Sequence, residues 1–122
     1  MSRLLLFFIV LLFASDALAQ RTVEHNETWS GKVVLSDAVR VAESALLTIE
    51  PGTEVLFDGS AGLTVHGRML AKGTAQQPIR FLPGAAEGSS SWRGISFLAA
   101  KGESELAHVH IEGAVQALTI NG

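Results

Sequence analysis

The sequence contains no cysteine, and after residue 19 it has only two aspartates, Asp37 and Asp58. Without cysteine the fold depends on packing and backbone hydrogen bonds rather than on disulfides. Two aspartates are too few for the several oxygen ligands that a hard cation usually takes, so we expect no metal site and no cofactor. The net charge of −3 argues against a nucleic-acid partner, which needs a basic face.

A helical pattern is also missing. No window after residue 19 sustains apolar residues at positions i, i+3, i+4 and i+7, so almost no helix is expected. Short runs of alternating apolar and polar residues recur instead, separated by glycines and polar clusters, and they predict an all-β chain. The expected strands are Val33–Leu35, Val39–Val41, Leu46–Ile49, Val55–Phe57, Leu63–Val65, Met69–Ala71, Ile79–Phe81, Ile95–Phe97, Ala107–Ile111 and Leu118–Ile120.

The first 19 residues have the pattern of a secretory signal peptide. Arg3 is followed by an unbroken apolar run from Leu4 to Phe13, and Ala17-Leu18-Ala19 offers a small-x-small cleavage site. The run is too short to cross a hydrocarbon core of ~30 Å, so no membrane span is expected after cleavage. We therefore predict a protein that is secreted, periplasmic or on the cell surface.

The expected strands recur in a fixed order. Internal repeats of this kind are the signature of a solenoid, so we consider a solenoid before other all-β folds. Two columns of similar apolar-polar-apolar triplets alternate along the chain, with irregular spacing between them. The first column holds Val39–Val41, Val55–Phe57, Ile79–Phe81 and Val109–Ile111. The second holds Leu47–Ile49, Leu63–Val65, Ile95–Phe97 and Leu118–Ile120. Met69–Ala71 is a candidate for a third column.

Stacking of like triplets explains this order. In each triplet the outer residues point to one side and the middle residue to the other, so stacked coils bury continuous apolar rows. The prediction is a right-handed parallel β-helix, a solenoid of about four coils, over residues 32–122. Residues 20–31 are expected to cap its first end, with Trp29 over the first apolar layer. The expected outward ladders are Thr48, Thr64, Ser96 and Thr119 on one face, and Arg40, Leu56, Arg80 and His110 on another.

The stretch from Leu47 to Phe57, with its Pro51-Gly52 turn, resembles the opening of secreted bacterial right-handed parallel β-helix proteins of the pectate-lyase-like superfamily. Residues 63–74, 77–81, 92–97 and 106–111 look like later coils of that superfamily, and the resemblance spans residues 29–120. It is specific for the fold and weak for activity. The enzymes of the superfamily carry an acidic calcium cluster or paired aspartates, and this chain departs from both patterns.

Four residues are candidates for ligand binding: Arg40, Arg80, His110 and Trp92. The arginines, with His110 in the same expected ladder, offer donors to an acidic polysaccharide. Trp92, if exposed, offers a ring that suits the apolar face of a sugar, and the alternative is that Trp92 is buried at a corner of the coil. His108 and His110 are expected to face the same side of one strand, a spacing that binds zinc only with further ligands. Ser89-Ser90-Ser91 is expected to form a flexible loop tip.

The function expected from these features is a non-catalytic envelope or extracellular scaffold. One face of the solenoid would bind polysaccharide or a protein partner. The alternative is the N-terminal part of a polysaccharide lyase or hydrolase that acts on acidic polysaccharide. The sequence stops one strand into a coil, at Leu118–Ile120, so we expect a fragment of a longer solenoid, or an exposed edge that stacks on further coils or another chain.

Overall fold

The computed structural model describes residues 20–98 and 102–121. The expected signal peptide, residues 1–19, lies outside the described residues, as do residues 99–101 and 122. No helix of the described part is long and apolar enough to cross a membrane. The elements are β1 (Gln20–Val23), β2 (Glu27–Trp29), β3 (Lys32–Leu35), β4 (Ala38–Val41), β5 (Leu46–Ile49), β6 (Glu54–Phe57), β7 (Leu63–Val65), β8 (Arg68–Lys72), β9 (Ile79–Pro83), the 3₁₀ helix η2 (Ser89–Ser91), β10 (Ile95–Leu98), β11 (Glu105–Ala107), β12 (Val109–Ile111) and β13 (Leu118–Asn121).

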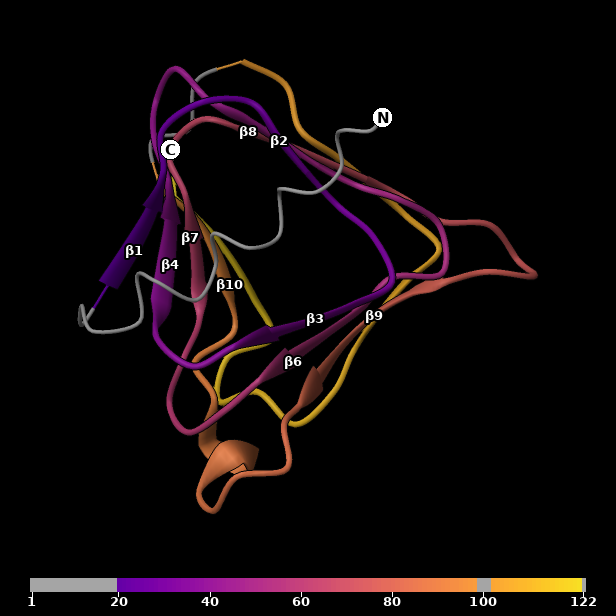
Figure 1. Cartoon of the computed structure of the whole chain (residues 1–122). Coiled ribbons are helices and arrows are strands. Elements are labelled where there is room, and N and C mark those ends of the chain that lie inside the picture. The colour runs from indigo at the N-terminus through magenta and orange to yellow at the C-terminus, as the bar shows by residue number, and fades with distance from the viewer. Residues whose placement is uncertain (1–19, 99–101, 122) are drawn as a thin grey trace, which may run out of the picture.

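The strands form three parallel sheets that enclose a triangular interior (Figure 1). Sheet A has the order β1-β4-β7-β10-β13, sheet B β2-β5-β8-β11, and sheet C β3-β6-β9-β12. Successive strands along the chain therefore belong to successive sheets, and the fourth strand returns to lie beside the first. This is the arrangement of a parallel β-helix, and the expectation of an all-β chain is confirmed.

Alternation along the strands separates core from surface. In sheet A, Val39, Leu63 and Ile95 are register partners and all are buried. The same holds in sheet B, where Leu47 pairs with the buried Met69. Because side chains alternate between the two faces of a strand, such rows run up the axis as continuous apolar columns. Their burial supplies most of the driving force for folding in a chain without disulfides.

The corners use few but specific residues. Gly52 follows Pro51 in the expected turn and has a φ of 82°, which a residue with a Cβ rarely adopts. Thr53 is fully buried after this turn, and its hydroxyl donates to the Glu50 carbonyl at 2.6 Å. At another corner a Cβ on Gly67 would lie 2.2 Å from the Ala42 carbonyl oxygen, so only glycine fits between these coils.

The two-column assignment is wrong at two strands. Leu47–Ile49 lies in sheet B beside Met69–Ala71, not in sheet A with Leu63–Val65. Val39–Val41 lies in sheet A, where Arg40 pairs with Thr64. The apolar-polar-apolar triplet is the same on all three faces, so a similar triplet does not identify the sheet. Met69–Ala71 does belong to a third sheet, as proposed.

The segment expected to cap the first end is part of the first coil. β1 pairs with β4 and β2 pairs with β5, both in parallel. Val23 and Trp29 are buried, so the segment contributes to the core as well as covering it. The solenoid therefore begins before residue 32, because even polar strands can pair when their few apolar residues face inward.

The serine-rich insert is not a flexible tip at Ser89. This residue is 3% exposed and opens the 3₁₀ helix η2. Its hydroxyl oxygen accepts from the Gly59 N–H at 3.0 Å and donates to the Ala86 carbonyl at 2.6 Å. The hydroxyl thus ties the insert to the corner of the preceding coil, a contact invisible in the local sequence.

Candidate functional site

The structure brings together two of the four candidate residues and separates the others. Arg80 on β9 and His110 on β12 are register partners in sheet C, and both are exposed. Arg40 lies on β4 in sheet A, between Thr22 and Thr64, and is half-buried. The expected single ladder of Arg40, Arg80 and His110 is therefore divided between two faces.

Trp92 is fully buried, which contradicts its expected role as an exposed stacking platform. Its ring stacks on Phe57 with centroids 4.0 Å apart and an interplanar angle of 9°. The indole N–H donates to the Glu112 carbonyl at 2.8 Å. Since both ring face and N–H are used within the protein, Trp92 anchors the insert to the core. The alternative expected from the sequence, burial of Trp92 within the coil, is the one that the structure shows.

A row of charged and polar side chains crosses sheet C. Lys32 pairs with Glu54, Glu54 with Arg80, and Arg80 with His110. We call these four residues the charged row. Neighbouring strands in a sheet lie about 4.8 Å apart, so the row presents a polar group at each step along the axis. The sequence had placed Leu56 beside Arg80; the true register differs by two residues, so Glu54 takes that place.

An outward apolar row runs beside the charged row. Val34 pairs with Leu56 and Leu56 with Leu82, and we call these three residues the apolar row. Val34 is 53% exposed, and the two leucines are half-buried. The row points outward because the intervening residues, such as Val55 and Phe81, fill the interior. Sheet C therefore offers an amphipathic strip to solvent.

The histidine pair does not have the expected geometry. His108 lies at the corner between β11 and β12 with a φ of 52°, so it is not in one strand with His110. Among residues 20–98 and 102–121, no group of three histidine, aspartate or glutamate side chains could hold a metal ion. Asp58 lies against Gly84, where a Cβ would come within 1.9 Å of its carboxylate oxygen. Asp58 therefore occupies a tight corner of the coil.

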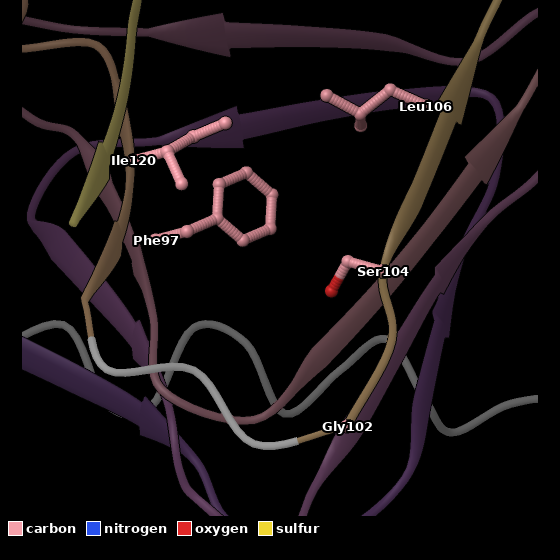
Figure 2. Close-up of a pocket in the computed structure, with 5 residues that line it drawn as sticks. All are labelled: Phe97, Gly102, Ser104, Leu106 and Ile120. Atoms are coloured by element: carbon pink, nitrogen blue, oxygen red, sulfur yellow. The ribbon is translucent and has the colours of Figure 1, made fainter. Parts of the chain in front are cut away.

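A second surface feature is a hollow at the end of the last coil (Figure 2). It has a volume of about 320 Å³. Phe97 of β10 and Ile120 of β13 lie on one side, and Ser104 and Leu106 face them from the strand opposite. Its lining is mostly apolar, because side chains of the inward rows bound it. The hollow is thus an apolar space beside β10 and β13 rather than a polar cleft.

Sequence reasoning missed the apolar row, although a signal for it was present. Val33-Val34-Leu35 and Val55-Leu56-Phe57 are continuous apolar runs, whereas a one-sided strand alternates. A central apolar residue in such a run must face outward if its neighbours face inward. The two runs therefore indicate an apolar strip on the outer surface of the sheet.

Comparison with known proteins gives no relative from which a fold or a site could be inferred. No family model, no curated protein and no solved structure matches it. The sheets, the charged row and the apolar row are accordingly the basis for the proposals that follow.

Proposed function

We propose that this chain is a secreted, non-catalytic β-helix scaffold that binds an extended acidic polysaccharide along sheet C. The observation that carries the proposal is the exposed pair Arg80 and His110, in direct register beside the apolar row. The guanidinium forms paired hydrogen bonds with a sugar carboxylate, and imidazole adds a further hydrogen-bonding group.

The two rows on sheet C match the two sides of a sugar ring. The C–H face of a pyranose can lie on Leu56 and Leu82, while its carboxylate meets Arg80. Glu54 lies beside Arg80 and limits the charge of the row, so binding is expected to be selective for a spaced array of anions rather than for any polyanion. The repeat of the sheet along its axis favours a polymer over a small ligand.

The finer features of the fold belong to the same proposal. The right-handed sense follows from the strong preference for right-handed crossovers between parallel strands. Membership in the pectate-lyase-like superfamily rests on the resemblance over residues 29–120, and secretion on the pattern of residues 1–19. Under this proposal the scaffold acts outside the cytoplasm.

The test is binding of polygalacturonate and alginate, measured by affinity electrophoresis and calorimetry. Arg80→Ala is expected to weaken binding by about tenfold, since it removes a charge-assisted contact. Arg40→Ala is the matched control, because it removes the same side chain from sheet A. Leu56→Ser tests the apolar row and should weaken binding less than Arg80→Ala.

Two results would contradict the proposal. Equal losses for the Arg80 and Arg40 variants would point to non-specific charge attraction rather than to sheet C. Release of unsaturated sugar products by the purified chain would establish lyase activity and exclude a non-catalytic role.

A further inference from the structure

The charged row alternates in sign along the axis of the solenoid. Lys32 on β3, Glu54 on β6 and Arg80 on β9 are consecutive register partners, and these strands lie side by side in sheet C (Figure 1). Lys32 and Arg80 are exposed, and Glu54 is half-buried between them. Along the axis a ligand therefore meets a cation, an anion and a second cation, one at each strand.

The backbone fixes the distances between these charges. The Glu54 N–H donates to the Gly31 carbonyl at 2.8 Å, and the Arg80 N–H donates to the Thr53 carbonyl at 2.9 Å. Both bonds belong to the parallel pairing between neighbouring coils, in which strands lie about 4.8 Å apart. At the backbone, Lys32 and Arg80 are therefore two strand spacings apart, or roughly 10 Å, and Glu54 lies midway. The spacing is set by the sheet rather than by a flexible loop.

The Glu54 carboxylate is available to a ligand. In the part of the chain that the structure describes, both ion pairs lie outside sheet C, and Glu54 forms none with Lys32 or Arg80. An anionic group is attracted at Lys32 and Arg80 but repelled at Glu54. A hydroxyl group, in contrast, can donate a hydrogen bond to the Glu54 carboxylate. The middle position of the row thus favours a neutral group.

The step between strands is close to the length of one sugar ring in an extended polysaccharide. Successive sugars of a polymer that lies along the axis therefore face successive strands. An acidic sugar suits Lys32 and Arg80, which form charge-assisted hydrogen bonds with its carboxylate. The sugar between them suits Glu54 only when it is neutral and offers hydroxyl groups. Leu56, two residues further along β6, gives the same ring an apolar surface.

The next position of the row accepts the same alternation. His110 is the register partner of Arg80 and is exposed. A neutral imidazole has one N–H donor and one nitrogen acceptor, so it can form hydrogen bonds with the hydroxyl groups of a neutral sugar. The four positions of the charged row therefore fit the order acidic, neutral, acidic, neutral.

We propose that sheet C selects polysaccharides in which acidic and neutral sugars alternate, and that Glu54 excludes a carboxylate from the middle position. This inference rests on the proposed binding of acidic polysaccharide to sheet C and specifies the ligand. Lys32 and Arg80 hold two carboxylates that are separated by one neutral sugar. A polymer made only of uronic acids places a third carboxylate opposite Glu54 and binds less tightly, because like charges then face each other.

Calorimetric titration with oligosaccharides of defined length tests the selection, at low salt so that the charges are little screened. The alternating probe is a hyaluronan tetrasaccharide, in which glucuronate and N-acetylglucosamine alternate, and the uniform probe is tetragalacturonate. The protein should bind the alternating probe about tenfold more tightly. A hyaluronan disaccharide, which carries a single carboxylate, should bind about tenfold more weakly than the tetrasaccharide, because it reaches only one of the two cations.

The variant Glu54→Gln separates the effect of charge from that of shape. It keeps the length of the side chain and a hydrogen-bonding oxygen but removes the negative charge. Its affinity for tetragalacturonate should rise by about tenfold, while its affinity for the hyaluronan tetrasaccharide should hardly change. Glu43→Gln is the matched control, because it makes the same substitution at an exposed position between β4 and β5, away from sheet C. Circular dichroism verifies that both variants fold.

Two results would overturn this inference and leave the proposed function in place. These are binding of tetragalacturonate as tight as that of the hyaluronan tetrasaccharide, and a preference for the alternating probe that Glu54→Gln leaves unchanged. Absence of binding to both probes, to polygalacturonate and to alginate would instead contradict the proposed function itself, and the inference with it.

Discussion

The first and last described coils differ in the chemistry of the same inward rows. In the first coil Arg21 and Glu27 occupy these rows as register partners of Val39 and Leu47, and their side chains form an ion pair at 2.8 Å. The Trp29 indole N–H donates to the same carboxylate. On β13, Leu118 and Ile120 continue the rows of Ile95 and Phe97. A repeating core can therefore hold paired polar side chains in one coil and apolar side chains in the others.

The largest expected effect compares two residues in one inward row. Ile95 is fully buried in the row and Leu118 is 43% exposed one coil later. Ile95→Ala should lower the free energy of unfolding by about 2–5 kcal/mol, as for other buried aliphatic residues. Leu118→Ala should cost clearly less, because part of its surface is already in water. Urea denaturation measures both. Equal losses would mean that Leu118 is covered in solution as fully as Ile95.

A smaller effect compares a carboxylate of the first coil with one on β11. Glu27→Ala leaves the Arg21 guanidinium and the Trp29 N–H without their acceptor, at a cost of about 1–3 kcal/mol in unfolding free energy. Glu105→Ala removes only the exposed pair with Lys72, which spans 3.8 Å, and should cost less than about 1 kcal/mol. Urea denaturation at low and high salt distinguishes them. A larger loss at Glu105 than at Glu27 would contradict this difference between the two ion pairs.

Much of the fold could be predicted because strand alternation and turn residues are local signals. Leu63–Val65, Ile95–Phe97 and Leu118–Ile120 do stack in one sheet, as their similarity predicted. The assignment failed at Leu47–Ile49, because the three faces bury the same triplet and nothing local distinguishes them. On sheet C, Glu54 rather than the expected Leu56 lies beside Arg80, a difference of two residues in register. A shift of two residues leaves the same side chains facing inward, so the apolar pattern cannot distinguish the two registers.

The candidate site was harder to predict, because burial depends on contacts between distant residues. Arg80 and His110 came together because both sit at middle positions of triplets that stack. Trp92 could not be placed, since its stacking partner Phe57 lies a coil away in the chain. The role of Arg21 was missed for a related reason: a polar residue at an inward position resembles a loop residue until the strand pairing is known.

The pairing pattern has a consequence for how the molecule is made. Each described strand pairs with the strands one coil before and one coil after it, so its partners in the sheet are near to it in the sequence. Such a chain can acquire structure progressively during synthesis or passage through a pore, each finished layer acting as the template for its successor.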